Sequence, residues 1–183
     1  TNNELSTTNF YLAVCDSTGH GVPGAFMSLL NISFLNEAVN ERKILAPAEI
    51  LNHVRERIIQ NLSTEGGKDG MDCSFAAFDF KKKALKYAAA NNQIWIVRKK
   101  ELIELNGDKM PVGKHDKEDQ SFTEHTIDLQ SGDLVYLFTD GFADQFGGPK
   151  GKKFMYKLLQ QLFVSIADMK AGGERTALDR VFG

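Results

Sequence analysis

Two aspartates that end apolar runs are the residues of this chain best suited to chemistry. Asp16 directly follows the hydrophobic run 10–15 and precedes a glycine-rich turn, and Asp140 follows the run 134–139 and precedes Gly141. A strand that ends in this way leaves its carboxylate exposed at a sheet edge. Glycine has no Cβ, so the backbone beside the carboxylate can approach a ligand closely. Such a place suits a metal ion or a phosphate group.

Each aspartate taken alone is also compatible with a plain turn, because Asp and Gly favour turns. The pair changes this interpretation. If the two carboxylates lay about 4 Å apart, they would repel each other by about 4 kcal/mol at an effective dielectric constant near 20, and a cation would relieve that repulsion. Oxygen ligands suit Mg²⁺ or Mn²⁺ rather than zinc, and the chain has no Cys–His cluster with zinc spacing. Spacing alone leaves open whether the two aspartates converge.

Three further polar residues have competing interpretations. His20, between Gly19 and Gly21, is either a proton donor or phosphate contact, or an imidazole that hydrogen-bonds the backbone of a cramped turn; we favour the second role. For Asp72 we favour a local loop hydrogen bond over catalysis. For Asp144 we favour a helix-capping or turn role over the orientation of a metal-bound water.

The composition is that of an ordinary soluble globular protein. The chain has 183 residues, 42% of them hydrophobic, and one domain is the default at this length. Its 22 basic and 24 acidic side chains nearly balance, which argues against nucleic acid as a partner. Cys15 and Cys73 lie in apolar runs and are expected to be reduced core thiols, which suits a cytoplasmic location. No apolar window is long enough to span a membrane, so no membrane contact is expected for this segment.

Periodicity predicts an α+β chain in which helices are layered on antiparallel sheets. The helix at 25–40 should bury a face that includes Phe26 and Leu29, and Pro47 should open a second helix. Short connections, among them Asn91-Asn92, predict that the strands between 72 and 105 form one antiparallel meander. The expected strands are 9–15, 72–80, 84–90, 93–99, 102–105, 122–128 and 133–139, and the expected C-terminal helices are 152–167 and 174–182.

Four stretches together resemble the SpoIIE-type branch of the metal-dependent protein phosphatases, the PPM or PP2C-like family. They are DSTGHGVPGAFMSLL, GMDCSFAAFDF, KMPVG and SGDLVYLFTDGFADQFGG. The resemblance implies a single SpoIIE-type phosphatase domain over residues 1–183. It implies a four-layer α-β-β-α sandwich with two antiparallel sheets, from which edge strands would be missing.

The resemblance also implies an activity and a set of site residues. The implied reaction is hydrolysis of phosphoserine or phosphothreonine on a protein by a metal-activated water, with two Mn²⁺ or Mg²⁺ ions in the intact domain. Asp16 matches the metal-bridging aspartate, Ser17 the residue that offers a backbone carbonyl to a metal, and Asp140 another metal-binding aspartate. Gly19, His20 and Gly21 are then candidates for substrate binding.

The chain departs from the family pattern at both ends. The family carries a further aspartate on an upstream strand, and this chain begins at Thr1, after the place where that aspartate would lie. The family also carries an aspartate pair that opens a last strand, and the last residues of this chain, 179–183, do not contain that pair. We therefore expect this segment to be a fragment of a longer enzyme that binds metal weakly, or with one ion at most, and is weakly active or inactive alone.

The family also implies partners. The expected substrate is a phosphorylated regulator, such as an anti-anti-sigma factor, in a bacterial signalling protein with N-terminal sensor domains. The location would be cytoplasmic, including the cytoplasmic end of a larger membrane-associated sensor, and a homodimer is an open option. Two alternatives stay open: a non-catalytic phosphoprotein-binding module on the same scaffold, and a divalent-metal phosphohydrolase that acts on a small molecule.

Overall fold

A computed structural model describes residues 9–62, 69–116, 119–147 and 152–167 of the chain. Its helical elements are α1 (Gly21–Asn36), the π-helical turn η1 (Glu37–Glu41), α2 (Pro47–Leu62), α3 (Asp140–Ala143) and α4 (Tyr156–Ile166). Its strands are β1 (Asn9–Ser17), β2 (Gly70–Asp79), β3 (Ala84–Ala90), β4 (Gln93–Arg98), β5 (Glu101–Asn106), β6 (Val112–Gly113), β7 (His125–Asp128), β8 (Leu134–Leu137), β9 (Phe146–Gly147) and β10 (Lys152–Lys153).

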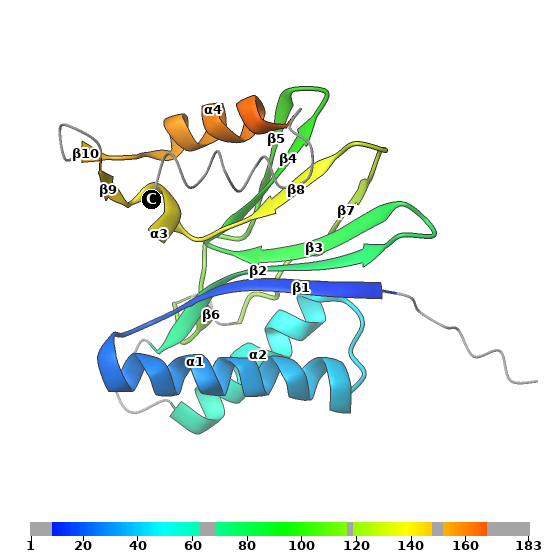
Figure 1. Ribbon diagram of the computed structural model, residues 1–183. Helices are drawn as coiled ribbons and strands as arrows, with labels where there is room; N and C mark the ends of the chain where they lie inside the picture. The colour runs from blue at the N-terminus through cyan, green and yellow to red at the C-terminus, as the bar shows by residue number, and fades with distance from the viewer. Residues whose placement is uncertain (1–8, 63–68, 117–118, 148–151, 168–183) are drawn as a thin grey trace, which may run out of the picture.

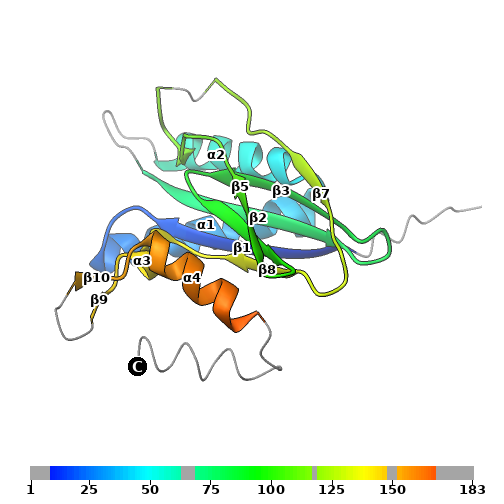
Figure 2. The same cartoon turned by 90° about the horizontal axis from the view of Figure 1, so that it is seen from above.

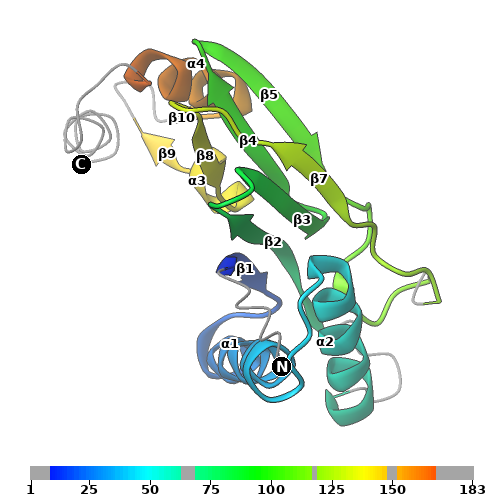
Figure 3. The same ribbon diagram turned by 90° about the vertical axis from the view of Figure 1, so that its right-hand side faces the viewer.

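The strands form two main antiparallel sheets that are stacked between helices (Figure 1). The first sheet has the order β1-β2-β3-β7, with β6 also paired to β2, and the second has the order β5-β4-β8. Helices α1 and α2 lie side by side against the first sheet, and α4 lies on the far side of the second (Figure 3). Seen from above, α4 runs at an angle to β1 (Figure 2). The predicted α+β architecture with two antiparallel sheets is confirmed.

Three apolar clusters separate these layers, and β4 shows how one strand serves two of them. Ile94 and Ile96 belong to the cluster between the two sheets, whereas Trp95 and Val97 belong to the cluster under α4. Successive side chains of a strand point to opposite faces, so a strand with both faces covered is apolar throughout. The third cluster fills the space between the first sheet and the α1/α2 pair, around the fully buried Leu51.

The predicted single meander is wrong at Asn91-Asn92. Strand β3 pairs with β2 and β7, whereas β4 pairs with β5 and β8, so the chain passes from one sheet to the other at this point. Asn91 has the positive φ of 56° that a tight turn favours, but its backbone N–H donates to the carbonyl of Asp108 instead of closing a hairpin. Strand periodicity fixes where a strand ends and not which sheet the next strand joins.

The expected inner face of the first helix is also wrong in part. Helix α1 begins at Gly21, four residues before the expected start, and Phe26 and Leu29 are 62% and 64% exposed. Met27 and Phe34 are buried as expected, and the polar Asn31 is buried with them. Apolar residues surround most of α1, so periodicity alone could not identify the buried side. The other predicted elements that lie in the described residues agree with the structure to within a few residues, whereas β6, α3, β9 and β10 were not predicted, and β10 lies where the C-terminal helix was expected to start. The helix expected at 174–182 lies outside the described residues.

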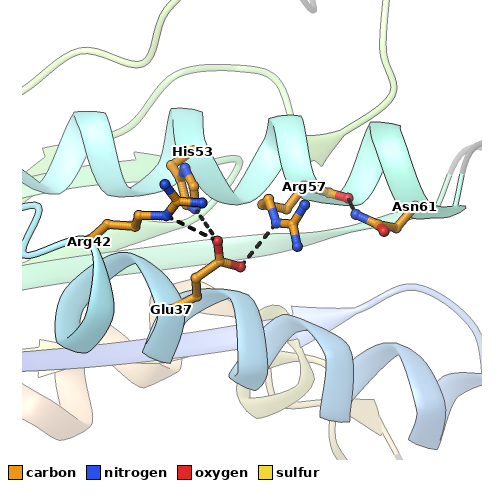
Figure 4. Close-up of polar contacts among 5 residues, drawn as sticks. All are labelled: Glu37, Arg42, His53, Arg57 and Asn61. Atoms are coloured by element: carbon orange, nitrogen blue, oxygen red, sulfur yellow. Dashed lines mark hydrogen bonds and ion pairs between the residues drawn. The ribbon is translucent and has the colours of Figure 1, made fainter.

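A carboxylate clasp holds the α1/η1 segment to α2 (Figure 4). Glu37 accepts a hydrogen bond from Nε of Arg57 at 3.0 Å, and its other oxygen lies 3.4 Å from Nε of Arg42 and 3.5 Å from Nε2 of His53. The hydrogen bond from Arg57 and the neighbouring positive charges lower the pKa of Glu37 despite the opposing effect of burial. These contacts hold the C-terminal end of α1, whose N-terminal end at Gly21 follows the turn after Asp16.

Both cysteines are free thiols in the apolar layer under the first sheet, with Cys73 buried and Cys15 half-buried. None of the described helices has the length and apolar character that a membrane span requires.

Candidate metal centre

Asp16 and Asp72 face each other across the β1–β2 ladder. The two strands pair antiparallel with Asp16 directly opposite Asp72, and residues opposite each other in a ladder place their side chains on the same face of the sheet. Oδ1 of Asp72 also accepts a hydrogen bond of 2.8 Å from Nδ2 of Asn91, at the corner where the chain leaves the first sheet. Asp72 therefore accepts a hydrogen bond from a residue that is distant in the sequence, rather than making the expected local loop hydrogen bond, and it is also a neighbour of Asp16.

Asp140 comes to the same place from the second sheet. Strand β8 ends at Leu137, and the chain turns into α3 at Asp140. The ends of β1 and β8, from which the chain continues to α1 and α3, lie at the same end of the molecule (Figure 1). The two aspartates that sequence analysis singled out are thus brought together, although they belong to different sheets.

The electrostatics of Asp16 report this proximity. The pKa of Asp16 is raised, first by partial desolvation and then by the negative charges of Asp140 and Asp72. Like charges disfavour each other's ionisation, so the folded protein holds the Asp16 proton more tightly than an isolated aspartate does. Both residues are exposed, so the pair is open to a ligand from solution.

The donors at this place are carboxylate oxygens, which fit a hard divalent cation such as Mg²⁺ or Mn²⁺ that retains several waters. Over the described residues, no group of three or more His, Cys, Asp or Glu side chains is arranged to hold a metal ion. The residues present therefore fit a cation held by two protein carboxylates and completed by water, rather than a closed all-protein site. The role of Asp16 and Asp140 as metal ligands stays a prediction.

The side chain of Ser17 accepts a hydrogen bond from Asn31, a residue that sequence analysis missed. Nδ2 of Asn31 donates a 3.0 Å hydrogen bond to Oγ of Ser17, and Asn31 is almost fully buried on α1. Its Oδ1 atom is buried and has no hydrogen-bond partner among the described residues. Burying a side-chain amide costs free energy of folding unless the amide makes hydrogen bonds. The bond from Asn31 to Ser17 therefore indicates that Asn31 positions the end of β1. The polar residue in the middle of an apolar helix was the signal that could have identified Asn31.

Thr18 closes the end of the β1–β2 ladder and was also missed. Its backbone N–H donates to the carbonyl of Gly70 at 3.0 Å, and its Oγ1 accepts from the Gly70 N–H at 3.1 Å. This double contact anchors the chain two residues beyond Asp16. A threonine beside glycines carries no clear sequence signal for such a role.

The glycine-rich turn folds back on itself directly after the site. Gly19 and Gly21 have positive φ values of 91° and 61°, which glycine adopts without a steric penalty. A Cβ atom on Gly24 would lie 2.7 Å from the carbonyl oxygen of Gly19, so the turn closes only because position 24 has no side chain. His20 is exposed and precedes α1 without a capping hydrogen bond from its ring. The expected hydrogen bond from this imidazole to the backbone at the helix start is absent there.

Asp144 and Tyr156 border Asp140. The backbone N–H of Asp144 donates to the carbonyl of Asp140 and ends α3, which agrees with the favoured turn role, and its carboxylate pairs with Lys153 at 2.7 Å. Burial, followed by the charges of Asp140 and Asp144, raises the pKa of Tyr156. The phenol of Tyr156 therefore stays protonated at neutral pH and can donate a hydrogen bond near the acidic pair.

An open apolar cavity of about 510 Å³ adjoins Asp140. Its lining includes Thr139 and Gly141, the two neighbours of Asp140, together with Val14 of β1 and residues of β8, α3 and α4. The acidic pair and a place for an apolar group thus lie next to each other.

The sequence matches the model of one protein family. The family model described as Stage II sporulation protein E (SpoIIE) matches residues 6–179. A comparison with curated protein sequences gives no match.

Solved structures share the fold. The SiaA-PP2C domain of Pseudomonas aeruginosa is 26% identical over 94% of this chain and 72% of that one, with a TM-score of 0.81. The structure of the RsbU and RsbW domains of Rv1364c from Mycobacterium tuberculosis is 20% identical, with a TM-score of 0.71, and is covered over 45% of its length by 94% of this chain. The structure of the SpoIIE phosphatase domain and a regulatory fragment from Bacillus subtilis is 14% identical, with a TM-score of 0.73, 94% of this chain and 49% of that chain covered. This chain belongs to the SpoIIE family of PP2C-type serine/threonine phosphatase domains.

Proposed function

We propose that this domain is a divalent-cation-dependent phosphatase that hydrolyses phosphoserine or phosphothreonine on a bacterial regulatory protein. The observation that carries the proposal is that the strand ends bearing Asp16 and Asp140 lie at the same end of the molecule (Figure 1), and that the neighbouring charges of Asp140 and Asp72, after burial, raise the pKa of Asp16. A divalent cation would relieve this repulsion. A regulator of the anti-anti-sigma type, in the cytoplasm, is the substrate we infer from the family resemblance. N-terminal sensor domains in the intact protein, and a homodimer, belong to the same proposal.

The residues have distinct roles in this proposal. Asp16 and Asp140 would hold Mn²⁺ or Mg²⁺, with the backbone carbonyl of Ser17 as a further ligand, and Asp72 adds negative charge across the ladder. A divalent cation bound there would polarise the phosphoryl oxygens and lower the pKa of a coordinated water. Asn31 and Thr18 position the end of β1.

The cavity beside Asp140 is lined mainly by apolar and aromatic side chains, among them Tyr136, Phe138 and Phe142. An apolar residue next to a phosphoserine in a peptide could occupy it. The preference for a phosphoprotein over a small-molecule substrate rests on the family and not on this cavity, because apolar cavities of this size also bind small molecules.

A second candidate function has one observation in its favour. Within the described residues no set of three metal-ligating side chains converges, so a phosphoprotein-binding module without turnover is also compatible with the scaffold. Such a module would bind a phosphopeptide through the same end of the molecule but would leave it intact.

The decisive experiment combines metal titration with turnover. Mn²⁺ is titrated by calorimetry into the intact protein and into Asp16→Asn, Asp140→Asn and the control Asp116→Asn, an exposed aspartate of a surface turn. We expect binding heat for the wild type and the control and none for the two site variants. Release of phosphate from a phosphoserine peptide should follow the same order. Equal heats for all four proteins would contradict the metal assignment, and metal binding without phosphate release would favour the binding module.

A further inference from the structure

Cys15 and Cys73 form a thiol pair that the proposed phosphatase chemistry does not use. They are directly opposite each other in the β1–β2 ladder, and their sulfur atoms are 3.3 Å apart. Both are free thiols. The 183-residue sequence has two cysteines, so an intramolecular disulfide within it can only link Cys15 to Cys73.

The ladder geometry suits a disulfide at this position. The N–H of Thr18 donates to the carbonyl of Gly70, which makes that pair a hydrogen-bonded one. Hydrogen-bonded and non-hydrogen-bonded pairs alternate along an antiparallel ladder, so Cys15 and Cys73, three positions back, form a non-hydrogen-bonded pair. Residues of such a pair have Cα atoms about 4.5 Å apart, within the range of about 4.4–6.8 Å that disulfides span. The sulfurs need to approach by little more than 1 Å to reach the bond length of about 2.05 Å.

The two thiols differ in access. Cys73 is completely buried on β2, between β1 and β3, whereas Cys15 is half-buried on β1, which has no second partner strand among the described residues. An oxidant from solution therefore reaches Cys15 first, and Cys73 lies behind it, in contact. This is the arrangement of an attacking cysteine with a resolving cysteine beside it.

The pair lies next to the acidic site in sequence but on the other face of the sheet. Cys15 precedes Asp16 and Cys73 follows Asp72, and neighbouring residues of a strand point to opposite faces. The thiols pack in the cluster under α1 and α2. A disulfide there would join β1 to β2 one residue away from Asp16 and from Asp72. It would lie on the opposite face of the sheet, so it would not occupy the space between these two carboxylates.

We propose that Cys15 and Cys73 are a reversible oxidation site that forms an intramolecular disulfide when the protein meets hydrogen peroxide. In the first step the Cys15 sulfur attacks a peroxide oxygen, the O–O bond breaks, and Cys15 becomes a sulfenic acid with release of one water. In the second step the Cys73 sulfur attacks the Cys15 sulfur, the S–O bond breaks, and a second water leaves. The two thiols lose two electrons in total, the peroxide gains them, and both thiol protons end in water. This inference depends on the thiol geometry and not on the phosphatase proposal.

The test uses the intact protein, reduced and then freed of reductant, in the presence of EDTA. After treatment with a small molar excess of hydrogen peroxide, both thiols should resist alkylation in denaturant, and the intact mass should fall by two hydrogens. A peptide map without reductant should contain one linked pair with Cys15 and Cys73, and dithiothreitol should restore both thiols. The same treatment in urea is the control, since the unfolded chain should give far less of this intramolecular link.

Single variants separate the two steps. Cys73→Ser should stop at a sulfenic acid on Cys15 that dimedone traps, whereas Cys15→Ser should leave Cys73 reduced because it is buried. If a variant does not fold, the wild-type peptide map decides alone. Thiols that remain fully alkylatable after peroxide, or oxidation that yields only sulfinic and sulfonic acids or links between molecules, would overturn the proposal.

Discussion

Replacing Asp140 by Asn should make the metal-free protein more stable while it removes the response to Mn²⁺. The reason is the electrostatic repulsion between Asp140 and Asp16, whose pKa is raised by burial and by the charges of Asp140 and Asp72. Without a cation, the folded wild type keeps the negative charges of Asp16 and Asp140 close together. In the unfolded chain these charges are far apart. Asn keeps the size and shape of the side chain and removes one charge.

The size of the effect follows from the exposure of the pair. Both side chains lie at the surface, so water screens the repulsion, and two unit charges about 4 Å apart in water interact by about 1 kcal/mol. For a domain of this size, about 1 kcal/mol changes the Tm by about 2–4 °C. We therefore expect Asp140→Asn to raise the Tm by about that amount in EDTA at neutral pH and low salt.

The sign of the pH dependence is fixed by the raised pKa of Asp16. The folded protein binds the Asp16 proton more tightly than the unfolded chain, so the wild type is free of this penalty at pH values below the unfolded pKa of about 3.9. The penalty develops as the pH rises through the higher folded pKa. The Tm advantage of Asp140→Asn should therefore be absent in acid and complete at neutral pH.

Thermal unfolding by circular dichroism, with EDTA or with Mn²⁺ and over a series of pH values, tests this reasoning. The wild type should gain Tm with Mn²⁺, and the variant should not, because a ligand stabilises only the state that binds it. Asp116→Asn, an exposed aspartate away from the pair, should change neither value. A lower Tm of Asp140→Asn in EDTA, or an equal gain with Mn²⁺, would refute this repulsion as the source of the effect.

Three further changes test the elements that position the site. Gly24→Ala places a Cβ about 2.7 Å from the Gly19 carbonyl oxygen and should cost about 1–3 kcal/mol in urea unfolding; an unchanged midpoint would mean that the turn yields freely. Asp133→Asn removes the negative charge and one of the two carboxylate oxygens to which Arg98 donates, at 2.9 and 2.7 Å, and should cost about 1.5–3 kcal/mol at neutral pH. Because Arg98 lowers the pKa of Asp133, that loss should vanish as the pH falls through this lowered pKa, and equal losses at all pH values would argue against the ion pair. Trp95→Ala removes a fully buried ring whose centroid is 4.5 Å from that of Phe138 and should cost about 3–5 kcal/mol, measured by the same unfolding; a cost below about 1 kcal/mol would mean that the layer under α4 refills the space.

Much of the local structure could be predicted because it depends on local patterns. The strand at 84–90 was predicted with its observed ends, and Pro47 opens α2 as expected. Apolar runs that end in an acid and a glycine marked both strand ends of the candidate site. These features follow from side-chain periodicity and turn chemistry, which act over a few residues.

Other features needed the tertiary structure because several arrangements satisfy the same local pattern. Nothing local decides that Asn91 leads into a different sheet, or that Phe26 is exposed while Asn31 is buried. The position of Asp72 opposite Asp16 depends on the register of two strands that are separated by two helices in the chain. Register is set by the packing of whole faces, not by either strand alone.

The sequence by itself determined the kinds of elements, the carboxylates at strand ends, the glycine turn and, through its motifs, the family. Only the tertiary structure decided that Asp16 and Asp140 meet, and that Cys15 and Cys73 touch. The physical reason is that hydrophobic periodicity specifies which side of an element is buried, whereas the stacking of two sheets specifies which strand ends become neighbours.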